Sequence, residues 1–132
     1  MITSISRGVL FVLFPLVLYP SCEKEIVQDP CADIKILRVI LEDTVQNRYR
    51  FTSSATFLEN ETTPILKYTG LENPSAAVII TDKEINKLPA STNNLTLKVY
   101  KNDSLIVSQP YIVGKDSCHV LLLEGPAKIT IK

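Results

Sequence analysis

The chain has 132 residues, enough for one domain and a short additional segment but not for two domains. Apolar residues make up 45% of the chain, which can build one hydrophobic core, and 14 basic residues balance 14 acidic ones. A near-neutral chain without a run of Lys or Arg has no positive field to attract phosphate groups. We therefore exclude binding to nucleic acid or, by charge alone, to an anionic membrane.

The N-terminal segment is predicted to be a targeting signal. Arg7 supplies one positive charge, and an uncharged apolar run follows over residues 8–19. This run is too short to cross a bilayer as a helix, which takes about 20 residues, and Pro15 interrupts it. Its length suits the apolar region of a secretory signal.

The targeting segment ends in a Ser21–Cys22 step. This step resembles the lipobox of bacterial lipoproteins, although Tyr19 and Pro20 depart from the usual pattern. The alternative is an ordinary secretory signal, which needs a small residue where Tyr19 stands. The resemblance implies a signal peptide over residues 1–21, acyl chains such as palmitate on Cys22, and anchorage in the bacterial outer membrane, facing either the periplasm or the exterior.

The three cysteines support this interpretation, because an odd number in an exported chain needs an explanation. Lipidation of Cys22 leaves Cys31 and Cys118, which bracket almost the whole mature domain. In an oxidising compartment we expect these two to form a disulfide, and closing so long a loop favours the folded state by roughly 4–5 kcal/mol. The alternative is a pair of free, buried thiols.

Residues 22–30 are polar, end in Pro30, and are predicted to form a lipidated tether. The charged residues Glu23, Lys24 and Glu25 are similar to the stretch that follows the lipidated cysteine in surface-displayed lipoproteins of the Bacteroidota type. Residues 31–132 are predicted to form the folded domain.

The folded domain shows the period-two alternation of half-buried strands. In chain order, the predicted strands are residues 34–41, 45–51, 78–81, 95–100, 105–108, 119–123 and 127–132. Turn residues predict hairpins at 101–104 and 124–126. Thr81 and Glu84 form a capping-box pattern, which predicts a short helix over residues 82–88.

Short strands at this spacing predict an all-β fold, an antiparallel β-sandwich of about seven strands with an immunoglobulin-like or transthyretin-like topology. The closing part of the chain, through Asp116, Cys118, His119 and Val120, resembles the end of carboxypeptidase-regulatory-like, transthyretin-like domains of Bacteroidota lipoproteins. The resemblance implies a sandwich used for spacing, adhesion or binding, and it carries no catalytic residues. The first half of the domain lacks that family's Gly-rich turn, so the topology stays open.

The sequence offers little for catalysis. His119 is the only histidine, no Gly-x-Ser-x-Gly turn is present, and the four glycines form no phosphate-binding loop. Zinc ligation by Cys31, Cys118 and His119 would lack the usual ligand spacing. We therefore expect no enzyme activity, metal or cofactor, and we expect His119 to be a partly exposed strand residue.

The predicted function is that of a non-enzymatic cell-envelope lipoprotein for adhesion, ligand binding or structural support, with an unidentified protein or glycan partner. The alternatives are an accessory subunit of an outer-membrane or surface assembly and, less favoured, a small hydrolase built on His119. Asp-Thr44-Val and Asp-Ser104-Leu steps look like O-glycosylation sites of Bacteroidota, which makes Thr44 and Ser104 candidate modification sites.

Overall fold

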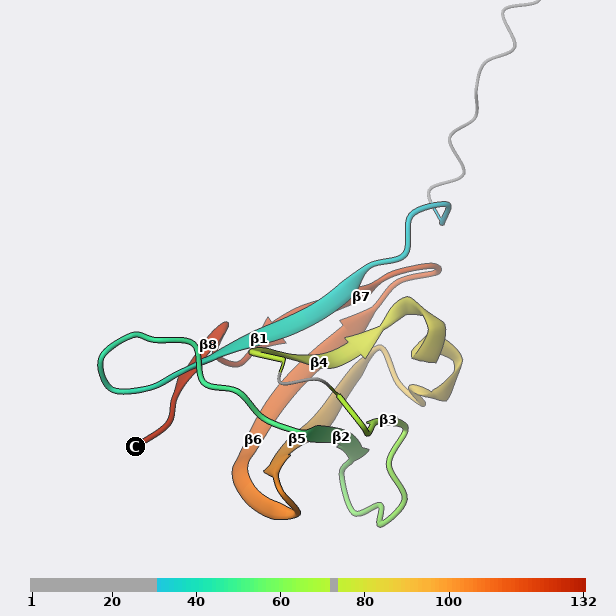
Figure 1. The fold of residues 1–132 in the computed structure, drawn as a ribbon. Helices are drawn as coiled ribbons and strands as arrows, with labels where there is room; N and C mark the ends of the chain where they lie inside the picture. Colours follow the sequence, from blue (N-terminus) through green and yellow to red (C-terminus); the bar gives the residue numbers. More distant parts are fainter. Residues whose placement is uncertain (1–30, 72–73) are drawn as a thin grey trace, which may run out of the picture.

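A computed structural model describes residues 31–71 and 74–132. These residues form eight strands and one short 3-10 helix, arranged as two packed sheets (Figure 1). The elements are β1 (Ile36–Glu42), β2 (Ser53–Leu58), β3 (Leu66–Tyr68), β4 (Ala76–Thr81), η1 (Asp82–Lys87), β5 (Thr92–Lys101), β6 (Ser104–Lys115), β7 (Val120–Glu124) and β8 (Lys128–Thr130). The predicted all-β sandwich is confirmed. The predicted signal peptide, Cys22 and the tether lie outside the described residues.

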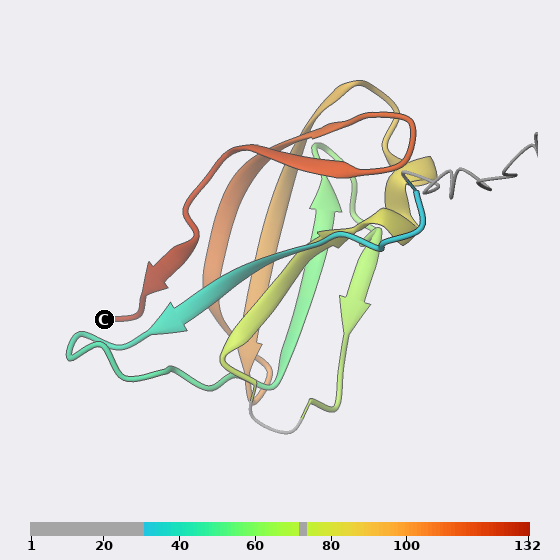
Figure 2. The ribbon, with the colours of Figure 1, turned by 90° about the horizontal axis from the view of Figure 1, so that it is seen from above.

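The two sheets differ in size and in strand direction. The smaller has the order β4-β1-β8, with β1 antiparallel to β4 and parallel to β8. The larger has the order β3-β2-β5-β6-β7 and is antiparallel throughout. Figure 2 shows β1 and β4 crossing over β2, β5 and β6, which places the core between the two layers.

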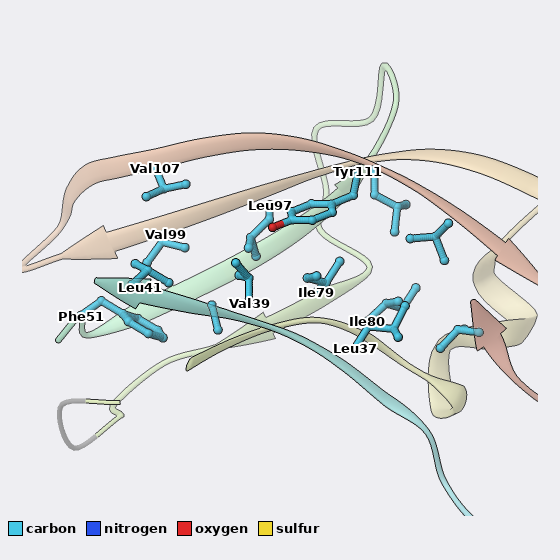
Figure 3. Close-up of a cluster of buried hydrophobic side chains, with 14 of the residues drawn as sticks. Leu37, Val39, Leu41, Phe51, Ile79, Ile80, Leu97, Val99, Val107 and Tyr111 are labelled. Carbon is cyan, nitrogen blue, oxygen red and sulfur yellow. The ribbon is translucent and has the colours of Figure 1, made fainter. Parts of the chain in front are cut away.

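Much of the core is formed by inward-facing positions that alternate with more exposed ones along β1 and β5. On β1 these are Leu37, Val39 and Leu41, and on β5 they are Leu95, Leu97 and Val99. Figure 3 shows the β1 side chains and those of Leu97 and Val99 meeting around Ile79 and Tyr111. The alternation over residues 95–100 therefore determines which face of the larger sheet packs against the smaller sheet.

Tyr111 is part of this core. Only 1% of it is accessible, and its hydroxyl donates to the carbonyl oxygen of Pro126 at 2.8 Å. Gly125 lies against the ring with φ +133°, and a Cβ there would stand 2.1 Å from Cδ1 of Tyr111. Only glycine fits this conformation and this contact.

The strand predicted over residues 45–51 is wrong. Oδ1 of Asp43 accepts the backbone N–H groups of Val45 and Asn47 at 3.0 and 2.9 Å, and Gln46 adopts φ +64°. These local hydrogen bonds to a side chain close a turn in which Val45 is 71% exposed. The alternation of apolar and polar residues in this segment therefore does not correspond to a buried and an exposed face of a strand. Phe51 is buried, but β2 begins two residues after it.

The two predicted hairpins have different outcomes. Asn102 and Asp103 both have positive φ, as a two-residue turn between antiparallel strands requires, and the β5–β6 hairpin is confirmed. Residues 124–126 do not form a hairpin. They carry the chain from β7 in the larger sheet to β8 in the smaller one, where β8 pairs with β1.

The predicted short helix is present as η1, a 3-10 helix. Thr81 caps it through its hydroxyl oxygen, and the Glu84 side chain accepts the backbone N–H of Thr81, which completes the capping box. Among the described residues, no helix is long and apolar enough to cross a membrane.

Candidate functional site

The end of the domain nearest the N-terminal segment is closed by a disulfide between Cys31 and Cys118. The two Cα atoms are 5.0 Å apart, and 87 residues separate them in sequence. Cys31 is the first described residue, and Cys118 lies in the connection between β6 and β7. The predicted pairing is therefore confirmed, and the bridge fastens the start of the domain to the larger sheet.

A carboxylate beside the disulfide holds three segments together. Asp82, at the start of η1, accepts the backbone N–H of Lys35 at 2.6 Å and that of Val120 at 2.8 Å. Its Oδ2 also lies 2.7 Å from Nδ1 of His119. One side chain thus joins the approach to β1, the helix and the first residue of β7. We call Asp82 and these partners the root junction.

The charge state of the root junction follows from these bonds. Partial burial acts to raise the pKa of Asp82, but the N–H of Lys35, the His119 ring and the N–H of Val120 together outweigh it and lower that pKa. The N–H groups of Cys118 and His119, at 2.9 and 2.7 Å from Oδ1, lower the pKa of Asp116. Both carboxylates are therefore held in the ionised form.

His119 lies in the loop before β7, not on a strand as predicted, because β7 begins at Val120. Its side chain is 25% exposed, against 10% for Asp82. It faces a hollow of about 370 Å³ whose lining also includes Asp33, Ile34 and Asp116. In residues 31–71 and 74–132 no group of three or more His, Cys, Asp or Glu side chains could hold a metal ion.

The adjacent hydroxyl is not arranged as a nucleophile for His119. Oγ of Ser117 is directed to Sγ of Cys118, at 4.0 Å. The acids around His119 serve the backbone: Asp82 and Asp116 each accept two backbone N–H groups. This arrangement is typical of a structural junction between chain segments.

A second candidate site lies on the outer face of the five-stranded sheet. The register pairs Asn94 with Ile112 and Thr96 with Pro110 on this face. Because β7 pairs with β6 only from Ile112 onward, a hollow of about 600 Å³ opens beside the earlier part of β6. Amide, hydroxyl and carboxylate groups line it beside proline and isoleucine, and its lining residues include neither Lys nor Arg.

A smaller hollow of about 320 Å³ lies on the β2–β3 side of the same face. Phe57 and Tyr100 contribute aromatic surface to it, and Nζ of Lys98 lies 5.0 Å from the Phe57 ring centre. Phe57 pairs with Thr96 across the sheet, so the two hollows are neighbours on one face. The sequence interpretation missed this face, because residues 53–58, which form β2, were not predicted to be a strand.

The candidate O-glycosylation residues are both exposed. Thr44 belongs to the turn after β1, and Ser104 begins β6. Both lie at the end of the sandwich away from the Cys31–Cys118 bridge, since β1 leads away from Cys31 and β6 leads towards Cys118. Their modification stays a prediction.

Comparison of the chain with known protein families, with curated proteins and with solved structures finds no match. The geometry of the root junction and of the outer sheet face is therefore the basis for a functional assignment.

Proposed function

We propose that this protein is a non-enzymatic lipoprotein of the bacterial cell envelope, anchored through Cys22, whose β-sandwich binds a partner on the outer face of its larger sheet. The observation that carries the proposal is the Cys31–Cys118 disulfide. Disulfides persist in oxidising compartments such as the periplasm and the cell surface. A domain that follows a signal-like segment and carries such a bridge fits export.

The use of the third cysteine supports the anchor. With Cys31 and Cys118 joined to each other, Cys22 is left over, at the end of the signal-like segment. A bare thiol at an exported surface would be open to oxidation, whereas acylation would consume it. More than one acyl chain gives lasting attachment to a bilayer.

The outer sheet face supports a binding role. It combines a hollow of about 600 Å³ with a neighbouring one of about 320 Å³, within the size range of ligand sites. The polar groups of the larger hollow and the aromatic rings of the smaller suit a polymeric partner, peptide or glycan, that lies across several strands. In the root junction, Asp82 joins three chain segments, which supports a structural role there.

The anchor is tested by substituting Cys22→Ala and separating membranes from soluble material. We expect the variant to appear in the soluble fraction, whereas the matched variant Ser21→Ala, which keeps a small residue before the cysteine, stays with the membrane. Mass spectrometry of the native protein should show acyl chains on residue 22. A Cys22→Ala variant that still fractionates with membranes, or an unmodified Cys22, would overturn the proposal.

A second candidate function is that of an accessory subunit, and the exposed leucines of β7 favour it. Leu123 is 54% exposed on a strand that forms the edge of the larger sheet, and Leu122 is also exposed. Exposed apolar residues on an edge strand provide a site for pairing with another chain. Replacing Leu123→Lys would abolish co-purification with such a partner and would leave binding at the outer face unchanged.

A further inference from the structure

We infer that the Cys31–Cys118 disulfide gives this domain resistance to mechanical force. It transmits a tensile force on the tether directly into the five-stranded sheet instead of through β1. The inference rests on the proposed function for the direction of the pull, with the lipid anchor on one side and a partner on the outer sheet face on the other. The effect of the disulfide on which sheet receives the force follows from the strand topology alone.

Without the bridge, the whole load would pass along residues 32–35 into β1. This strand belongs to the smaller sheet, where it has five register pairs with β4 and three with β8. The partner-binding face belongs to the other sheet. A force between tether and partner would therefore act across the core and would tend to separate β1 from the rest of the sandwich.

With the bridge, the load passes from Cys31 to Cys118, which lies between the end of β6 and the start of β7. β6 pairs with β5 over ten register positions, the longest ladder of the described structure. The force thus enters the sheet that carries the outer face and does not pass through β1.

The root junction restricts the movement of the chain segments on both sides of the disulfide. Asp82 accepts the N–H groups of Lys35 and Val120, so the backbone is fixed four residues after Cys31 and two residues after Cys118. The two ends of the bridge are therefore held by the same carboxylate. A tensile force on Cys31 therefore acts directly on hydrogen-bonded structure, without first extending a flexible segment.

The bridge also limits how far the protein can extend. Ser108, exposed on the outer face opposite Lys98, lies 10 residues from Cys118 and 77 from Cys31. Since an extended chain spans at most about 3.6 Å per residue, a partner held at Ser108 could move about 35 Å through the short arm and about 280 Å through the long one. The bridge makes the short arm the limit, a difference of roughly eightfold.

The test is single-molecule stretching of the mature chain, residues 22–132, between a handle at the N-terminus and a clickable azide side chain in place of Ser108. We expect the bridged protein to gain no more than about 35 Å at any force below covalent rupture. The double variant Cys31→Ser, Cys118→Ser should gain several times more, up to a limit of about 280 Å, and yield at a lower force, because forced unfolding then follows the unfolding rate of the domain. Equal yield forces, or a bridged chain that extends as far as the variant, would overturn the inference.

A second measurement keeps the test decisive if the double variant does not fold. The bridged protein is held under tension, dithiothreitol is added, and the tension is then raised. Dithiothreitol becomes a cyclic disulfide as Cys31 and Cys118 become thiols. The long extension should then appear in the same molecule, and its absence would count against the inference. The outcome is independent of the anchor, because release of the Cys22→Ala variant from membranes does not depend on mechanical behaviour.

Discussion

The root junction gives the sharpest prediction for stability, through Asp82→Asn. The amide keeps the shape of the side chain but has one acceptor oxygen instead of two, and its NH₂ group would face the N–H of either Lys35 or Val120. It also removes the negative charge beside His119. A hydrogen bond to a charged group contributes about 1.5–3 kcal/mol, and the Lys35 bond is partly replaced by water because it is exposed. We expect a loss of about 2 kcal/mol.

The measurement is urea unfolding of the wild type, Asp82→Asn and the matched control Asp33→Asn, with the disulfide intact in all three. Asp33 borders the same hollow but is exposed, so its substitution should change the free energy of unfolding by less than about 0.5 kcal/mol. In thermal unfolding, a loss of about 2 kcal/mol corresponds to a fall of roughly 8–16 °C for a domain of this size. If Asp82→Asn is as stable as Asp33→Asn, the junction does not hold the three segments together.

The same pair of proteins gives a pH test with a defined sign. Because the pKa of Asp82 is lowered in the folded state, its contribution is fully present above the unfolded value, about 3.9, and is lost as the pH falls through the folded value. The wild type should therefore lose its advantage over Asp82→Asn on acidification below about pH 4. The main causes of the lowered pKa of Asp116, the N–H groups of Cys118 and His119, are present in both proteins, so most of the Asp116 contribution cancels in the difference. A difference that grows in acid would contradict the assigned sign.

The remaining predictions concern the core and the bridge. Gly125→Ala should lower the free energy of unfolding by about 2–4 kcal/mol in urea, because its Cβ would overlap the Tyr111 ring at a backbone conformation that disfavours a side chain; an unchanged midpoint would refute this contact. Burial raises the pKa of Tyr111 to about 12, so ultraviolet titration of the folded protein should show one tyrosine that ionises near pH 12, and stability should fall as the unfolded chain ionises above about pH 10. Tyr111→Phe should cost about 1 kcal/mol through the lost bond to Pro126 and should remove that late titration. The Cys31→Ser, Cys118→Ser variant should lose about 4–5 kcal/mol, and a loss below about 1 kcal/mol would show that the bridge adds little to stability.

The features that sequence interpretation predicts well are those whose cause lies within a few residues. Alternation over residues 95–100 predicts β5, because neighbouring inward positions all face one core. The Thr81 and Glu84 spacing predicts η1, since the capping box is made between residues three apart. The turn residues at 101–104 predict the β5–β6 hairpin, whose two central residues adopt positive φ.

The failures arise where a competing local bond or a distant partner decides the structure. Alternation at 45–51 is overruled by the Asp43 side chain, which closes a turn before any strand can pair. Residues 124–126 look like a hairpin turn, yet the strand after them finds its partner in β1, far away in the sequence. β2 shows weak alternation, since Ala55 and Thr56 are both buried, and it was missed along with the outer face.

The root junction shows why counting residues predicts a covalent contact but not an ionic one. If Cys22 is set aside as the predicted lipidation site, the three cysteines leave a single pairing, so Cys31 and Cys118 can be matched without knowing the fold. Asp82 is one of 14 acidic residues, and its partners lie 37 to 47 positions away in sequence. Nothing in the spacing distinguishes it from a solvated surface acid. The disulfide and the Asp82 hydrogen bonds nevertheless act together, because the carboxylate fixes the backbone next to both cysteines. Without these hydrogen bonds, the segments that flank the disulfide would first have to be extended before the disulfide could transmit a force.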